Sequence, residues 1–153
     1  MTLREFLRRK NRGDGLLAHS LLPAAASDNW PGFRGPSRQG DAPGPALPLQ
    51  WSPTDKVKWK TAVPGEGWSS PIVWGGDVFL TTTEDRGVSC RLLCFDAATG
   101  ALKWNTEVFK QATARKENRN SYATPTPVTD GKHVYAVFGG GGIAGVEFGD
   151  IGL

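Results

Sequence analysis

Three segments of this chain recur farther along it in the same order. The pairs are 57–61 (Val-Lys-Trp-Lys-Thr) with 102–106 (Leu-Lys-Trp-Asn-Thr), 68–71 (Trp-Ser-Ser-Pro) with 122–125 (Tyr-Ala-Thr-Pro), and 73–80 with 128–136. The first pair is separated by 45 residues and the second by 54. A period of this length is typical of chains that repeat one supersecondary unit, each copy stacking on the next. The repeat therefore limits the fold to a row of similar units.

Each unit has the composition and spacing of short β-strands. Leu92–Phe95 is an apolar run of strand length, Asp96–Gly100 has turn chemistry, and Leu102 and Trp104 then alternate with Lys103. The alternation in 57–61 predicts another strand. The frequent glycine and proline, 20 and 11 residues, also favour strands and turns over helices.

About four short strands in every 45 to 55 residues is typical of a β-propeller blade. The sequence therefore predicts an all-β fold over residues 28–153, with one complete four-stranded blade and part of a second. A two-blade piece leaves strand edges unpaired, so we expect this region to be an incomplete part of a larger propeller.

The segment Asp96-Ala97-Ala98-Thr99-Gly100, followed by Trp104, resembles the tryptophan-docking repeat of quinoprotein-like propellers. The resemblance implies a propeller of seven or eight blades. It also implies that Trp104 and Trp59 pack between adjacent blades and that the Thr99-Gly100 turn braces them. The residues themselves indicate that Asp96 is a turn former, because a short carboxylate accepts hydrogen bonds from turn amides.

The order of motifs over roughly residues 28–146 is similar to the opening of exported PQQ-like repeat proteins. The matching segments are 29–36, Trp51, 57–60 and 65–71. Such proteins are common in planctomycete-type bacteria and related to the outer-membrane assembly propeller lipoprotein. This resemblance implies an N-terminal fragment of an exported propeller.

The first 27 residues have the order of a secretory signal peptide: basic residues to position 12, an apolar stretch over 15–22, then small residues with a possible cut after Ala26. Alternatives are a disordered or short helical leader, or a wrongly assigned start codon. We expect a periplasmic or otherwise exported protein. No apolar stretch has the 18 or more residues of a membrane span, so no transmembrane segment is expected.

The net charge of +3 does not indicate a nucleic-acid partner, because the basic clusters at the N-terminus and at 115–119 contain no interleaved aromatic residues. On one strand, Cys90 and Cys94 would lie about 13 Å apart, too far for a disulfide. We expect Cys94 to be buried and Cys90 to lie near a loop. Their spacing is not that of a zinc site.

The resemblance implies two functions. Family enzymes use PQQ with calcium, an Asp base and commonly an adjacent cysteine pair, and this chain has no such pair. We therefore expect no catalytic, cofactor-binding or metal residues here, and a scaffold or binding module for a protein or another cell-envelope component. The alternative is part of a PQQ-dependent quinoprotein dehydrogenase whose active-site residues lie outside this fragment, with PQQ and calcium as cofactors.

Trp68 and Tyr122 occupy equivalent places in the repeat, just before a Ser-Pro or Thr-Pro step. One interpretation is that both pack at the entrance to a blade, because each repeat needs an anchor there. The other is that they form part of a face that contacts a ligand by stacking.

Overall fold

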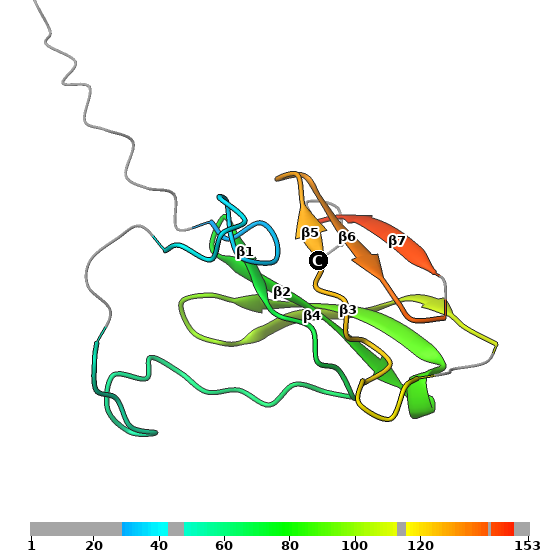
Figure 1. The fold of residues 1–153 in the computed structure, drawn as a ribbon, viewed down its shortest axis with the longest axis horizontal. Helices are drawn as coiled ribbons and strands as arrows, with labels where there is room; N and C mark the ends of the chain where they lie inside the picture. Colours follow the sequence, from blue (N-terminus) through cyan, green and yellow to red (C-terminus); the bar gives the residue numbers. More distant parts are fainter. Residues whose placement is uncertain (1–28, 43–47, 113–115, 141, 149–153) are drawn as a thin grey trace, which may run out of the picture.

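The computed structural model describes residues 29–42, 48–112, 116–140 and 142–148 (Figure 1). The predicted leader, 1–27, with its cut after Ala26, lies outside the described residues. Strands and one short 3-10 helix make up the regular structure. They are β1 (Ile72–Trp74), β2 (Asp77–Glu84), η1 (Asp85–Gly87), β3 (Ser89–Asp96), β4 (Leu102–Lys110), β5 (Val128–Thr129), β6 (His133–Val137) and β7 (Ile143–Glu147).

The strands form two antiparallel sheets that follow each other along the chain (Figure 1). The first has four strands in the order β1-β2-β3-β4, and the second has three in the order β5-β6-β7. This arrangement confirms the prediction of an all-β chain with one complete four-stranded blade and part of a second. Both blades arise from hairpins, because successive strands in each sheet are also neighbours in space.

The main hydrophobic core lies between the two sheets. One face of the first sheet contributes single residues of β1 and β2 and alternate residues of β3, and the second sheet contributes residues of β6. Its buried members are Ile72, Phe79, Cys90, Leu92, Cys94, Ala123, Val134, Ala136 and Phe138. The Phe79 ring lies 5.9 Å from that of Trp104 and 5.1 Å from that of Phe148, between centroids. Burial of this apolar surface holds the two sheets together.

A smaller cluster covers the opposite face of the first sheet. Val78, Leu93 and Phe95 are buried there, and the partly buried ring of Trp59 packs against them. This arrangement follows from the period of two in a strand, which directs Val78 and Phe79 to opposite faces.

The prediction of a strand at 57–61 is wrong for the described chain. Residues 57–61 have no regular secondary structure, and no backbone hydrogen bond joins them to another described residue. The segment runs alongside the first sheet, held by its tryptophan (Figure 1). Alternation alone cannot make a strand, because a strand requires a neighbour to satisfy its backbone groups.

Residues 29–31 connect the two sheets. Trp30 and Val73 exchange both backbone hydrogen bonds, 2.7 and 2.9 Å between nitrogen and oxygen, at the outer edge of β1. The next carbonyl, of Pro31, accepts a hydrogen bond of 2.9 Å from the Thr129 amide of β5. We call residues 29–31 the inter-sheet clip, because consecutive residues are bonded to different sheets.

Cys90 and Cys94 are free thiols that point to the same face of β3, into the main core. Cys90 lies near a loop, as expected, because it is the second residue of β3; it is also fully buried. Burial raises the pKa of the Cys90 thiol to about 11 and that of Cys94 to about 12.

We therefore expect both thiols of the folded protein to be unreactive toward a colorimetric thiol reagent at pH 8. The thiolate is the reactive form, and core packing keeps the reagent away. In denaturant both thiols should react rapidly. Rapid reaction of either thiol in the native protein would contradict this burial.

Candidate functional site

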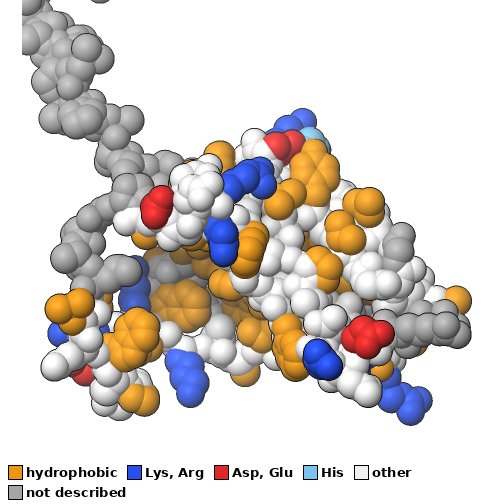
Figure 2. Space-filling view, viewed as in Figure 1, with side chains coloured by type: hydrophobic (Ala, Val, Ile, Leu, Met, Phe, Trp, Pro, Cys, Tyr) orange, Lys and Arg blue, Asp and Glu red, His pale blue; other side chains and the backbone are white. Residues whose placement is uncertain are grey.

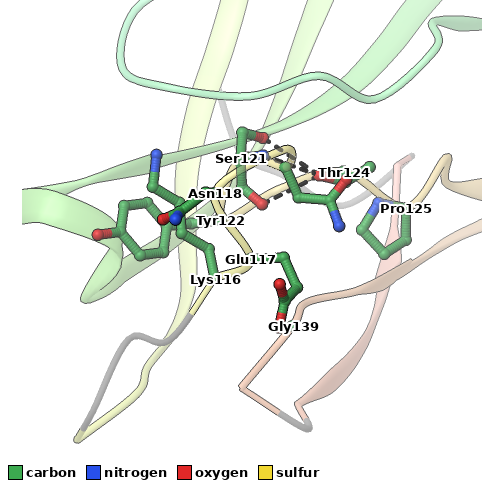
Figure 3. Close-up of a pocket in the computed structure, with 9 residues that line it drawn as sticks. Lys116, Glu117, Asn118, Ser121, Tyr122, Thr124, Pro125 and Gly139 are labelled. Carbon is green, nitrogen blue, oxygen red and sulfur yellow. Dashed lines mark hydrogen bonds between the residues drawn. The ribbon is translucent and has the colours of Figure 1, made fainter.

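An open pocket of about 880 Å³ lies where the connection after β4 passes the β6–β7 turn (Figure 3). Polar and aromatic side chains make up most of its wall. The residues that line it are Lys116, Glu117, Asn118, Asn120, Ser121, Tyr122, Thr124, Pro125 and Gly139.

A compact hydrogen-bonded turn holds the wall of this pocket in place. The Thr124 hydroxyl donates to the Ser121 carbonyl at 3.0 Å and accepts from the Ser121 amide at 3.2 Å (Figure 3). The Ala123 amide donates to the Ser121 hydroxyl at 3.2 Å, and the Ala123 side chain is buried in the main core. Short hydroxyl side chains close such turns by bonding nearby backbone groups. The position of Tyr122, between Ser121 and Ala123, is therefore fixed by the core.

Lys116 links this wall to a segment 50 residues earlier. Its ammonium nitrogen lies 2.8 Å from Oε1 of Glu66 and 4.9 Å from the centroid of the Tyr122 ring. The hydrogen bond to Glu66 raises the pKa of Lys116. The three side chains therefore form a charge-compensated cluster beside the pocket, with the cation over an aromatic face.

Glycines on both sides of Glu66 bring it close to β2. Glu66 and Thr83 exchange backbone hydrogen bonds of 2.8 and 3.0 Å. A Cβ at Gly65 would lie 2.5 Å from the Thr83 carbonyl oxygen, and one at Gly67 would lie 2.6 Å from that of Thr81. Only glycine permits this approach of two backbones.

The backbone segments that carry Trp68 and Tyr122, the two predicted contact residues, lie side by side. The Trp68 amide donates a hydrogen bond of 2.9 Å to the carbonyl of Ala123, the residue after Tyr122. Tyr122 is half-buried and lines the pocket, whereas Trp68 does not line it and its side chain is 61% exposed. The two segments 65–68 and 115–121 were expected to form part of a face, but the pairing of Lys116 with Glu66 was not predicted, because nothing in the sequence relates the two residues.

Of the predicted repeat-motif residues, Asp96, Thr99, Gly100 and Trp59 are brought together. The Asp96 carboxylate accepts hydrogen bonds from the amides of Ala98 and Thr99, at 3.0 and 2.8 Å, and from the Thr99 hydroxyl at 2.8 Å. Gly100 ends the turn at φ 74°. One oxygen of the Asp96 carboxylate, Oδ1, therefore shapes the turn by accepting all three bonds.

The Trp59 indole lies across this turn. Its Nε1 donates a hydrogen bond of 2.9 Å to the Ala97 carbonyl, and a Cβ at Gly100 would lie 2.5 Å from its ring. Trp104 packs against the main core, and thus on the other face of the first sheet. Trp74 lies in the same way against Gly131, where a Cβ would be 2.6 Å from the indole, and this contact was not predicted.

The hydrogen bonds of Asp96 predict how the thermal stability of the protein changes with pH. Hydrogen bonds from Thr99 lower the pKa of the Asp96 carboxyl group in the folded protein. The ionised carboxylate therefore stabilises the fold at any pH above the pKa of an unfolded Asp, about 3.9. This contribution to stability is lost as the pH falls below that value toward the lower pKa of the folded state. We expect Asp96→Asn to destabilise the protein at pH 7 and to flatten the fall in Tm between pH 7 and pH 3. Thermal unfolding by circular dichroism at a series of pH values measures this. Parallel pH profiles for the two proteins would contradict the role of the charge.

A calcium ion beside PQQ would need metal-ligating side chains among the described residues. Among them, no group of three or more His, Cys, Asp or Glu side chains could hold a metal ion. The two thiols are four residues apart and buried between the sheets, so they offer no disulfide against a quinone. We derive no catalytic step through this cofactor.

No helix in the described ranges is long and apolar enough to span a membrane. No curated protein matches this chain, and neither does any solved structure. Residues 49–150, about two thirds of the chain, match a family model described as outer membrane protein assembly factor BamB. The match covers both sheets and the repeated strand order. The chain therefore belongs to this family of PQQ-like repeat proteins.

Proposed function

We propose that this chain is a non-catalytic part of a propeller and serves as a scaffold or binding module in the cell envelope. The main support is the exposed indole of Trp68 beside a pocket whose wall is hydrogen-bonded and joined to the core through Ala123. Tryptophan, tyrosine and arginine are the residues that most often dominate the energy of protein interfaces. An exposed tryptophan on a fixed backbone loses little conformational freedom on binding.

The chemistry of the pocket favours a protein segment as its ligand. The Lys116 charge is compensated by Glu66, which weakens attraction for a phosphate group. The remaining wall offers the amides of Asn118 and Asn120 and the hydroxyl groups of the turn, which both donate and accept. Such groups complement a peptide backbone. The family description, an outer membrane protein assembly factor, supports a place in the cell envelope.

The repeat motif has a separate, structural role in this proposal. Trp104 of β4 lies on one face of the first sheet, and Trp59 packs against the opposite face, as expected of residues that dock one blade against the next. The turn formed by Asp96, Thr99 and Gly100 receives the indole of Trp59. The motif then stabilises the scaffold and leaves the pocket side free for a partner.

The experiment is photo-crosslinking to isolated cell envelopes from the source cells, followed by identification of the captured protein. Trp68→Ala should reduce capture of that protein at least tenfold and leave Tm nearly unchanged, because the indole is exposed. Trp51→Ala is the control, since Trp51 is 77% exposed and does not line the pocket. Equal capture by wild type, Trp68→Ala and Trp51→Ala would overturn the assignment of this face.

The dehydrogenase alternative has its own test. PQQ and calcium are added to the protein while the quinone absorbance and dye-linked oxidation of alcohols and sugars are followed. We expect no saturable spectral change and no oxidation. A stoichiometric change with turnover would replace the scaffold proposal by an enzymatic one.

A further inference from the structure

A second pocket, of about 410 Å³, lies at the end of the first sheet where two of its turns meet. The β1–β2 turn, the β3–β4 turn, the inter-sheet clip and the segment 57–61 all contribute to its wall. The surface on this side of the molecule is hollowed between the segments 29–42 and 48–60, and basic side chains lie at the margin of the hollow (Figure 2). We call this site the turn pocket, and its polar lining residues are Asn29, Lys58, Asp77, Asp96 and Lys103.

The turn pocket and the pocket beside Tyr122 lie at opposite ends of the first sheet. Asp77 and Asp96 of the turn pocket are paired where β2 begins and β3 ends. The other pocket lies near the far end of β2, because Lys116 in its wall is bonded to Glu66, which pairs with a residue near the end of β2. A ligand in the turn pocket therefore does not compete with the partner proposed above.

The charged side chains of the turn pocket carry two positive and two negative charges. The Lys103 ammonium lies 2.8 Å from Oδ1 of Asp77, and this hydrogen bond raises the pKa of Lys103. Lys58 and Asp96 differ from that pair, since no described carboxylate lies within 4.0 Å of the Lys58 ammonium. The pocket thus contains two opposite charges that do not contact each other.

Asp96 and Asn29 each keep a polar group that the turns do not use. Oδ1 of Asp96 accepts the bonds of the turn, and Oδ2 makes no hydrogen bond to a described residue. The bonds from Thr99 lower the pKa of Asp96, so this carboxyl group is ionised at neutral pH. Oδ1 of Asn29 accepts a bond of 2.9 Å from the Gly75 amide, which leaves the NH2 group of Asn29 to donate. The pocket therefore offers donors and an anionic acceptor to a ligand.

Small residues leave the space between these groups open. A Cβ at Gly75 or Gly76 would meet no atom within 4 Å, and Ala97 and Ala98 form the facing turn. No aromatic side chain of the described residues lines the pocket, so a flat ring would have no face on which to stack. The shape and the charges therefore favour a small linear ligand that carries both charges.

We propose that the turn pocket binds a small zwitterion with one carboxylate and one ammonium group, the chemistry of an amino acid or a short peptide. The ligand carboxylate accepts hydrogen bonds from Lys58 and the NH2 group of Asn29, and the ligand ammonium donates to Oδ2 of Asp96. Hydrogen bonds of this charge-assisted kind are stronger than neutral ones. A ligand with a single charge leaves one of the two pocket charges without a partner, which lowers its affinity.

Titration of the 153-residue chain with glycylglycine, followed by amide NMR, tests the proposal. We expect saturable shifts of the Gly76, Ala97 and Ala98 amides, with a dissociation constant of about 1 mM or below. Acetate and methylammonium each carry one of the two charges, and both should bind about tenfold more weakly or worse.

Lys58→Gln is the test variant and Lys60→Gln is its matched control. Both lysines are exposed in the segment 57–61, but Lys60 does not line the turn pocket. We expect glycylglycine to bind Lys58→Gln about tenfold more weakly than the wild type and to bind Lys60→Gln as tightly as the wild type.

Three results would overturn the proposal. One is the absence of a saturable shift by about 20 mM glycylglycine, well above the expected dissociation constant. Another is equal affinity for acetate and glycylglycine, because the pocket would then be a simple anion site. The third is equal affinity of Lys58→Gln and Lys60→Gln for glycylglycine, which would place the ligand elsewhere. None of these results depends on the capture of a partner at Trp68, so the two proposals fail separately.

Discussion

Gly100→Ala lowers the free energy of unfolding by about 3 kcal/mol, because two penalties add at this position. Gly100 has φ +74°, a conformation that L side chains rarely adopt, and a Cβ there would lie 2.5 Å from the Trp59 ring. The indole cannot move away without losing its hydrogen bond to the Ala97 carbonyl. We therefore also expect Trp59 to become more exposed, with a red shift of its fluorescence. Chemical denaturation followed by circular dichroism gives the free energy.

Gly76→Ala is the matched control for this substitution. Gly76 lies in the turn between β1 and β2 with φ +91°, and a Cβ there meets no atom within 4 Å. It carries the conformational penalty without the clash, so about 1 kcal/mol is expected. If the two variants were equally destabilised, the packing of Trp59 on Gly100 would contribute nothing to stability.

Phe79→Ala should be the most destabilising substitution in the main core, at about 3–5 kcal/mol. Phe79 is 0% exposed, and its ring contacts those of Trp104 in β4 and of Phe148, the residue after β7. Removal of the ring leaves a cavity between the sheets. We therefore expect unfolding to lose cooperativity as well as stability, which would appear as a lower m-value or as separate transitions by fluorescence and circular dichroism.

Phe33→Ala provides the comparison, since Phe33 is 59% exposed. A surface phenylalanine should cost no more than about 0.5 kcal/mol. A similar loss from both substitutions would show that the contact between the sheets is not what limits stability.

Local features of the sequence predicted most of the first sheet. The strand, turn and strand over 92–104 form as expected because their signals act over a few residues: an apolar run, an Asx turn at Asp96, and a glycine at a positive φ. The repeat then predicted the second sheet by analogy with the first. Residues 57–61 failed as a strand because pairing depends on a distant partner that periodicity does not identify.

The candidate site was predicted only in part, for a similar reason. Trp68 and Tyr122 follow from the repeat, because they precede equivalent strands. The pair of Lys116 with Glu66 does not, since it joins two irregular connections 50 residues apart. The burial of Cys90 depended on where β3 begins, and the start of a strand is poorly defined by sequence alone.

The inter-sheet clip has a consequence for the order in which the chain acquires its structure. The bond between Pro31 and Thr129 closes a loop of about 100 residues. At about 5–20 residues per second, a ribosome takes roughly 5–20 s to make that length, and contacts of such separation also form slowly. Until Thr129 has been synthesised, Pro31 has no partner in β5. The first part of the folded region to be synthesised thus completes its contacts only after the whole first sheet has been made.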